Sequence, residues 1–349
     1  MLHSSDKFIM KGKDLFELQE WCEKKGHPKF RAQQLFEWMY FHGEIDPHQM
    51  SNLSKELIND LTSNCILQTL EIEKVSSSRS EATNKFLFRT LEGRFIETVS
   101  MVEENRHTVC VSSQIGCNVD CDFCATATMG IIRNLNTGEI VDQLKIIREK
   151  VESPITNVVF MGMGEPFLNY ERVLRAADIF HSQRGFGLGA HRITISTAGI
   201  LPKIKKFYVE GRKYKLAISL NASNDKTRSK IMPINNKWPL SELVSIGRTH
   251  AHRNRKVMFE YVLLAGINDS IDNARELATL LRGVDCKINV IPYNETDGKY
   301  RRPENEVIES FLEILSAHQK GYRVMVRWSK GQDIDAGCGQ LAVKQESLE

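Results

Sequence analysis

Three cysteines, Cys117, Cys121 and Cys124, lie close together in the stretch IGCNVDCDFC. Closely set cysteines in a chain of 349 residues indicate metal or redox chemistry rather than a disulfide framework. A structural zinc site takes four ligands, and iron–sulfur clusters also usually take four thiolates. A cluster held by only three thiolates leaves one iron open to another molecule, and this loop predicts such a cluster. Zinc with Cys110 as its fourth ligand is the alternative.

The cysteine loop follows the first of several short segments rich in β-branched residues, most of them separated by stretches that can each hold a helix. This alternation predicts parallel βαβ units, so we expect an α/β protein built on a partial (βα)6 barrel. The carboxyl ends of barrel strands carry the active site, and the cysteine loop opens there. The segments are TVCVSS, NVVFMGMG, RITISTAG, KLAISLNA, VMFEYVLL and KINVIPYN, with RVMVRWSK as a seventh run.

The region before the barrel shows two other patterns. FELQEWCEKK, FRAQQLFEWMYF and LSKELINDLTS each place apolar residues at helical spacing. NKFLFRT and RFIETVSM flank the sequence LEG, which predicts a β-hairpin. We therefore expect a helical accessory domain (1–75), a β-hairpin extension (76–105) and a catalytic barrel with a C-terminal loop (106–349).

Composition and charge are those of a soluble globular protein, and a net charge of +3 does not demand a nucleic-acid partner. No apolar run approaches the roughly 20 residues of a membrane helix. The N-terminus has no apolar signal core, so we expect a cytoplasmic protein without a membrane partner. Two basic clusters are candidates for phosphate contacts: Arg248, Arg253, Arg255 and Lys256, and then Lys299, Arg301 and Arg302.

Several motifs carry a resemblance to a known family. CNVDCDFC resembles the signature of the radical S-adenosylmethionine (SAM) superfamily, and FMGMGEP resembles its glycine-rich SAM-binding motif. RITISTAGI, LAISLNA, MPIN and DIDAGCGQL are similar to the RlmN/Cfr family of radical SAM RNA adenine methyltransferases. The resemblance runs from RAQQLFEW to Leu341, nearly the whole chain. It implies a 4Fe-4S cluster on the three loop cysteines and two SAM molecules per turnover.

The resemblance also implies a reaction, the methylation of carbon 2 of an adenosine in 23S rRNA and of one beside the anticodon of tRNA. One SAM methylates a cysteine, and the other yields a 5′-deoxyadenosyl radical that takes hydrogen from that methyl group. The methyl radical adds to adenine, and a base and a second cysteine then resolve the covalent protein–RNA adduct. We further expect RNA contacts through the helical domain, an external electron donor such as flavodoxin, and a monomer.

Three residues match the family's catalytic positions. Cys338, in DIDAGCGQL, matches the methyl-carrying cysteine, and its flanking glycines suit a mobile loop. Cys110 matches the resolving cysteine that forms a transient disulfide with Cys338, although alternate strand residues also face a core. Glu97 matches the proton acceptor, although it would also suit the polar face of a hairpin. A base working near neutrality needs a pKa raised by burial. Asp333 and Asp335 are assigned to shaping the Cys338 loop.

The SAM contacts implied by the family fall at strand ends. Gly164 and Glu165 offer a backbone carbonyl and a carboxylate to the ammonium of SAM. Position 221 is Asn where family members usually carry His, but Asn still donates and accepts hydrogen bonds. The complete set is Gly164, Glu165, Ser196, Ser219, Leu220, Asn221 and Asn294.

Three other functions compete with this one. The sister activity methylates carbon 8 of adenosine and confers antibiotic resistance, and Pro166 favours the carbon-2 branch. A non-catalytic RNA-binding protein with a structural metal would need four permanent ligands and has no use for Cys338 between glycines. A radical SAM enzyme acting on a substrate other than RNA would not need the pair of Cys110 and Cys338.

Overall fold

The computed structural model of the chain describes residues 7–249, 256–296, 298–318 and 321–343. Arg253 and Arg255 of the first basic cluster lie outside these ranges. Within them, no helix combines the length and the apolar composition required to cross a bilayer.

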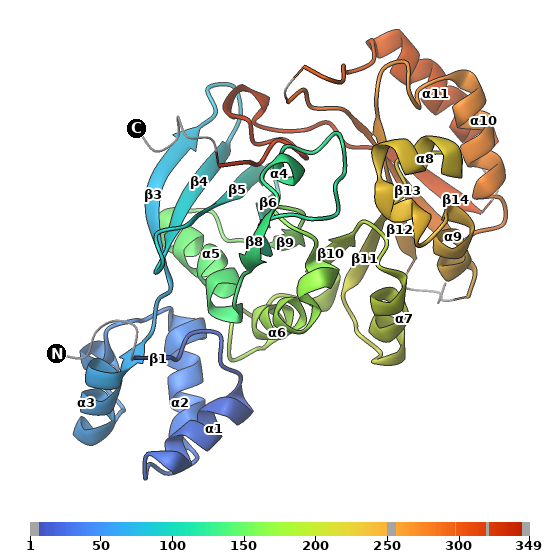
Figure 1. The fold of residues 1–349 in the computed structure, drawn as a ribbon. Helices are drawn as coiled ribbons and strands as arrows, with labels where there is room; N and C mark the ends of the chain where they lie inside the picture. Colours follow the sequence, from blue (N-terminus) through green and yellow to red (C-terminus); the bar gives the residue numbers. More distant parts are fainter. Residues whose placement is uncertain (1–6, 250–255, 297, 319–320, 344–349) are drawn as a thin grey trace.

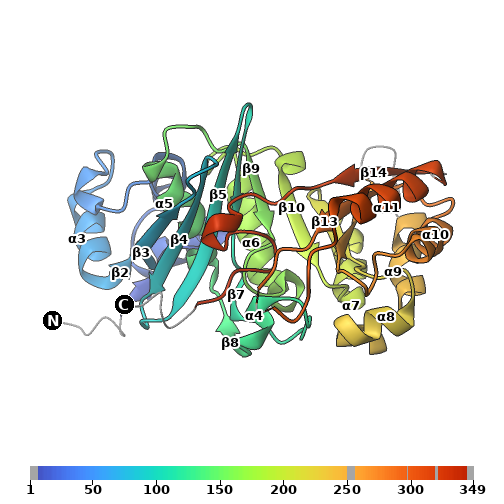
Figure 2. The same ribbon diagram turned by 90° about the horizontal axis from the view of Figure 1, so that it is seen from above.

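A ten-stranded sheet forms the centre of the molecule (Figures 1 and 2). Its order is β14-β13-β12-β11-β10-β9-β6-β5-β4-β3, with neighbours parallel from β14 to β6 and antiparallel from β6 to β3. Because β14 and β3 are the two ends of this order, the barrel stays open. The strands are β3 (Leu70–Ser77), β4 (Thr83–Thr90), β5 (Phe95–Glu103), β6 (Arg106–Cys110), β9 (Asn157–Phe160), β10 (Ile193–Thr197), β11 (Lys215–Ser219), β12 (Val257–Leu263), β13 (Cys286–Pro292) and β14 (Tyr322–Val326).

Helices connect the parallel strands and pack on their outer side (Figure 1). The inner parallel strands are the most buried: every residue of β9 is buried, as expected for a strand covered on both faces, whereas only Tyr322 is buried in the edge strand β14. An Asn136–Glu139 capping box starts the longest helix. The helices of this part are α4 (Ala125–Thr128), α5 (Thr137–Lys150), α6 (Tyr170–His181), α7 (Leu201–Val209), α8 (Asp225–Ile231), α9 (Leu240–Thr249), α10 (Ile271–Leu280) and α11 (Asn305–Ala317).

The N-terminal helices form a smaller body at one side of the sheet (Figure 1). Asp14 caps the first helix and Ser54 the third, each through a side-chain oxygen that accepts a backbone N–H. The second helix continues into a π-helical turn. The elements are β1 (Phe8–Ile9), α1 (Leu15–Lys24), α2 (Arg31–Glu37), the π-helix Trp38–His42, α3 (Lys55–Asn64) and β2 (Cys65–Ile66).

A buried ion pair joins this body to the barrel. Lys11 Nζ lies 3.4 Å from Asp142 Oδ1 on α5, and both side chains are fully buried. Asp142 Oδ2 also accepts from the Thr69 N–H and hydroxyl, at 2.5 and 2.7 Å. Burial lowers the pKa of Lys11, and the negative charge of Asp142 opposes that shift. Removal of either partner would therefore leave a buried charge without its counter-ion between the N-terminal helices and the barrel.

The α/β fold, the three N-terminal helices and the hairpin are confirmed. Two features differ in extent from the prediction. Among the described residues, the ten-stranded sheet has seven parallel strands, because α11 leads from β13 into β14, which pairs with β13 in parallel. Residues 70–75, predicted within the helical segment, belong to β3, which extends the hairpin by a third antiparallel strand. The alternation in LEIEKVSS marks that strand.

Candidate active site

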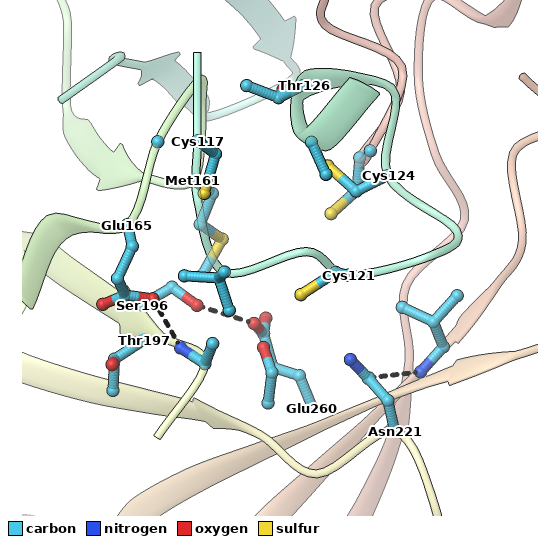
Figure 3. Close-up of a pocket in the computed structure, with 18 of the residues that line it drawn as sticks. Cys117, Cys121, Cys124, Thr126, Met161, Glu165, Ser196, Thr197, Asn221 and Glu260 are labelled. Carbon is cyan, nitrogen blue, oxygen red and sulfur yellow. Dashed lines mark hydrogen bonds between the residues drawn. The ribbon is translucent and has the colours of Figure 1, made fainter. Parts of the chain in front are cut away.

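A cavity opens at the carboxyl ends of the parallel strands, beneath the three-cysteine loop (Figure 3). The loop supplies one wall, the turn after β9 a second, and strand-end side chains the floor. Nine of the residues predicted from the sequence line it: Cys117, Cys121, Cys124, Gly164, Glu165, Ser196, Ser219, Asn221 and Cys338. Glu97, Cys110, Leu220 and Asn294 lie outside this lining.

The loop is shaped by a close backbone crossing at its start. β7 (Gln114–Gly116) pairs with β8 (Ile131–Asn134). A Cβ on Gly116 would lie 1.7 Å from the Gly130 carbonyl oxygen, and its φ is +76°, so only glycine fits. The Cys117 N–H donates to the same carbonyl at 3.0 Å. This crossing closes the loop and turns the thiols toward the cavity.

The thiols suit a cluster better than a single ion. Burial raises the pKa of Cys117 to about 12, and that of Cys121 well above its ordinary value, so both need a metal to become thiolates. Among the described His, Cys, Asp and Glu residues, no three converge closely enough to hold one metal ion. Three soft sulfur ligands spread around a cavity wall fit a 4Fe-4S cluster with one iron left open.

The turn after β9 provides the wall opposite the cluster loop. Gly164 has φ +95°, and a Cβ there would lie 2.5 Å from Gln114 Cβ. A side chain at this position would therefore clash with Gln114, which precedes the cysteine loop. Glu165 accepts from the Phe167 N–H at 2.9 Å and from the Ala198 N–H at 2.7 Å. Burial raises the pKa of Glu165 to about 7, against the effect of these N–H donors. Each oxygen keeps a lone pair for a further donor.

Asn221 occupies a position that restricts the side chain. Its φ is +55°, in the left-handed region where Asn and His are enriched among non-glycine residues. Its Oδ1 accepts from the Val262 N–H at 2.9 Å, and its Nδ2 donates to Met232 Sδ at 3.2 Å. Asn221 therefore suits the backbone geometry at this position and anchors β12.

The C-terminal segment folds back over the cavity and carries Cys338 into it. It crosses from β14 toward α4 and the strands β4 and β5 (Figure 1). Asn294 Nδ2 donates to the Cys338 carbonyl at 3.0 Å, and the Ala125 N–H donates to the Gly339 carbonyl at 2.8 Å. Asp333 accepts the Arg79 N–H at 2.9 Å and so ties this segment to the turn between β3 and β4. Asn294, predicted to contact SAM, thus holds the cysteine loop.

Cys110 and Cys338 are both free thiols, and the charge of Cys110 contributes to raising the pKa of Cys338. Burial raises the pKa of Cys110 to about 11 and that of Cys338 to about 12. The charge of Arg327 lowers both pKa values, and Glu260 raises both. The two thiols therefore share one electrostatic environment, although they come from β6 and from a loop more than 200 residues later.

Glu97 lies on β5 with its carboxylate buried. Lys85 Nζ is 3.0 Å from Oε1, and the Ala342 N–H donates to Oε2 at 3.0 Å. Burial raises the pKa of Glu97, and Lys85 is the largest opposing influence. Ala342 follows Cys338 by four residues, so the segment that carries Cys338 also contacts Glu97. The carboxylate thus has the raised pKa that a base near neutrality requires.

Two buried charged residues escaped the sequence reasoning. Arg228 on α8 donates to the carbonyls of Ala198, Ser219 and Leu220 and to Asn235 Oδ1, and so ties together the loops after β10 and β11. No pattern in the sequence around Arg228 indicates that this residue is buried. Glu260 lines the cavity from β12, and the signal was an acid in the middle of the apolar run VMFEYVLL.

A three-cysteine loop after the first parallel strand of an open α/β barrel, above a cavity at the carboxyl ends of the strands, is typical of radical SAM enzymes. The family model described as the radical SAM superfamily matches residues 111–278. A second model, the N-terminal domain of ribosomal RNA large subunit methyltransferases, matches residues 10–67.

Individual relatives show to which family within the radical SAM class the chain belongs. A dual-specificity RNA methyltransferase RlmN from Geobacter sulfurreducens is 42% identical over 97% of this chain and 93% of the relative. A dual-specificity RNA methyltransferase RlmN from Bdellovibrio bacteriovorus is 41% identical over 95% of this chain and 83% of the relative. The crystal structure of a radical SAM methyltransferase from Sphaerobacter thermophilus superposes with a TM-score of 0.90, at 43% identity, over 97% of this chain and 100% of that chain. The chain belongs to the RlmN family of radical SAM RNA methyltransferases.

Proposed function

We propose that this enzyme methylates carbon 2 of an adenosine in large-subunit ribosomal RNA and in transfer RNA, through a methylated cysteine. The observation that carries the proposal is the place of Cys338, which lines the same cavity as the three loop cysteines. A methyl-carrying cysteine must reach the cofactors, and its place in this cavity supports that role; the influence of Cys110 on its pKa supports Cys110 as the resolving thiol. These RNA substrates place the proposed reaction in the cytoplasm.

Each residue then has a defined task. Cys117, Cys121 and Cys124 hold three irons of the 4Fe-4S cluster. When bound, the cluster and two SAM molecules supply the methyl group and the 5′-deoxyadenosyl radical. Cys338 carries the methyl carbon to adenine, and Glu97 takes the proton from carbon 2.

Release of the product falls to the thiol of Cys110. It attacks the Cys338 sulfur, and the bond from that sulfur to the methylene carbon breaks with its electron pair staying on the carbon. That carbon takes up a proton and becomes the methyl group of the free RNA, while the two sulfurs, together oxidised by two electrons, form a disulfide. Gly164, Glu165, Ser196, Ser219 and Asn221 are positioned to surround SAM, while Leu220 and Asn294 support its walls.

The proposed partners are RNA and an electron donor. The match of residues 10–67 to a ribosomal RNA methyltransferase domain supports RNA contacts through the N-terminal helices. Each of the two predicted basic clusters has one lysine in an ion pair: Lys256 pairs with Asp285, and Lys299 pairs with Asp122. The positive charge of each cluster is therefore partly neutralised. We propose a flavodoxin-type electron donor and a monomer as in the family.

The test is mass spectrometry of nucleosides from ribosomal and transfer RNA of cells with and without the gene. The expected result is 2-methyladenosine that disappears with the gene, returns with the wild type and fails to return with Cys338→Ala. Cys286→Ala is the matched control, because Cys286 is a buried thiol of β13 outside the cavity. An 8-methyladenosine mark would assign the chain to the carbon-8 activity instead, and no change in either nucleoside would refute the proposal.

A further inference from the structure

A second cavity, of about 520 Å³, lies inside the open barrel, where residues of β6, β9, β10, β12, β13 and β14 line it. It meets the cavity of the three loop cysteines at Met161 and Cys338, which line both. Arg327, the residue directly after β14, lines the second cavity. A cation therefore lies on the far side of Cys338 from the cluster loop.

The guanidinium of Arg327 meets a poor acceptor. Its Nη1 donates to Met161 Sδ at 3.3 Å, and a thioether sulfur accepts hydrogen bonds only weakly. Within the part of the chain that the structure describes, no carboxylate forms an ion pair with Arg327. The side chain is partly buried, and a guanidinium has five N–H donors to satisfy. This arrangement points to an anion that forms or arrives beside Arg327 during the reaction.

The thiol of Cys110 faces the same place. Thr108 lines the second cavity, and Cys110 lies two residues further along β6, so its side chain points to the same face of the sheet. Its register partner on β9, Val159, also lines this cavity. The backbone of Met161 forms a hydrogen bond that lowers the pKa of Cys110. Met161 thus contacts Cys110 through its backbone and Arg327 through its sulfur.

We propose that Arg327 stabilises the thiolate of Cys110 when this residue attacks the Cys338 sulfur to release the methylated RNA. The inference rests on the proposed function, in which Cys338 holds the RNA through a methylene carbon. The Cys110 proton passes to solvent, and the methylene carbon gains a proton as its bond to Cys338 breaks. The two sulfurs together give two electrons to that carbon and form a disulfide, so the step needs no other oxidant or reductant. Arg327 acts through Cys110 and does not touch the RNA.

The resolving step needs such a cation. Burial raises the pKa of Cys110 to about 11, so nearly all of this thiol is protonated at neutral pH, whereas the attacking species is the thiolate. Glu260 on β12 raises the pKa further, and Cys338 carries no charge while it is bonded to the methylene carbon. Arg327 is the charged side chain that opposes both burial and Glu260. A nearby opposite charge shifts a pKa by about 1–3 units, and we expect the lower end because Arg327 is only partly buried.

The test is a single-turnover reaction of cluster-loaded enzyme, methylated on Cys338, with SAM and RNA under anoxic conditions. Samples quenched over time are run on a denaturing gel, which reports both formation and decay of the covalent protein–RNA adduct. Arg327→Met is expected to form the adduct at the wild-type rate and to release it about 3- to 10-fold more slowly. A pKa raised by about one unit lowers the thiolate fraction tenfold, while the remaining thiolate is a somewhat stronger nucleophile. Arg327→Lys keeps the charge and is expected to retain most of the rate.

A change of the attacking atom separates charge from structure. Selenocysteine in place of Cys110 is a much stronger acid than cysteine and ionises without help from a cation. In that background, Arg327→Met is expected to leave the decay of the adduct unchanged, whereas a packing defect would slow it as before. Arg323→Met is the matched control, because Arg323 is an exposed arginine of the same strand, β14. Arg327→Gln replaces Arg327→Met if the latter does not fold.

Three outcomes would overturn the inference: normal adduct decay in the Arg327 variants, slow decay that persists with selenocysteine, and slow adduct formation with normal decay. The last would assign Arg327 to an RNA phosphate instead. Cys110→Ala, in which the adduct should accumulate, is the reference for the proposed function. If neither this variant forms an adduct nor the wild type forms 2-methyladenosine, the proposed function fails and this inference with it. If both do so while the Arg327 variants match the wild type, only the inference fails.

Discussion

Lys85 is expected to set the pH at which Glu97 can act as a base. Its ammonium lies 3.0 Å from Glu97 Oε1, and the two side chains are 15% and 3% exposed. At an effective dielectric constant of about 20, a pair at that distance interacts by about 5 kcal/mol. Desolvation of both groups offsets much of this, and an adjacent opposite charge typically shifts a carboxyl pKa by about 1–3 units.

The replacement Lys85→Met should therefore raise the already raised pKa of Glu97 by about 1–3 units. The pKa of Glu97 rises because its carboxylate, the charged form, loses the cation that stabilises it. A base acts only when deprotonated, so methyl transfer at neutral pH should fall about 10- to 1000-fold if proton removal limits it. The lost rate should return as the pH is raised by the same number of units.

The assay is single-turnover formation of 2-methyladenosine by enzyme already methylated on Cys338, followed by mass spectrometry across the neutral and alkaline range. Lys85→Arg retains the cation and should keep a profile near that of the wild type. Lys74→Met removes an exposed lysine from the neighbouring strand β3 and should change nothing. A profile for Lys85→Met that stays in place or moves to lower pH would refute the assignment of Glu97 as the base.

Three further predictions concern the resolving thiol and the buried charges. Cys110→Ala should leave RNA covalently joined to the protein at Cys338, visible as a slowly migrating species on a denaturing gel that ribonuclease removes. Arg228→Met should lower the free energy of unfolding by about 3 kcal/mol or more in urea titrations, because several buried carbonyls lose their donor. Lys11→Met should cost about 3–5 kcal/mol by leaving Asp142 charged and unpaired, and Lys11→Met combined with Asp142→Leu should recover most of that loss.

The local elements were predictable because their causes are local. Apolar spacing marked the N-terminal helices, and short β-branched runs marked the parallel strands. The third antiparallel strand was missed, although LEIEKVSS alternates, because it follows directly on a helical segment. The seventh parallel strand was seen as a run, but its place in the sheet depends on α11 crossing back over the barrel, and such a crossover is a tertiary event.

The features of the active site also divide into those that the sequence predicted and those that depend on the tertiary structure. Cysteine spacing alone indicated an open iron–sulfur site, since a loop of eight residues determines which thiols can share a cluster. The resemblance assigned roles to Glu97 and Cys338. The sequence could not show that Asn294 holds the Cys338 loop, because that contact joins residues 44 positions apart.

The sequence by itself therefore predicted the three cluster cysteines, most of the strands and helices, and the family, because each of these depends on short motifs of residues close together in the chain. Only the tertiary structure decided which side chains meet. Long-range folding brings Cys338 into the cavity of the three loop cysteines, buries Glu97 against Lys85, and leaves one oxygen of Glu260 without a hydrogen-bond partner. Burial and the charges that surround a group set its pKa, and both exist only once distant segments are packed together.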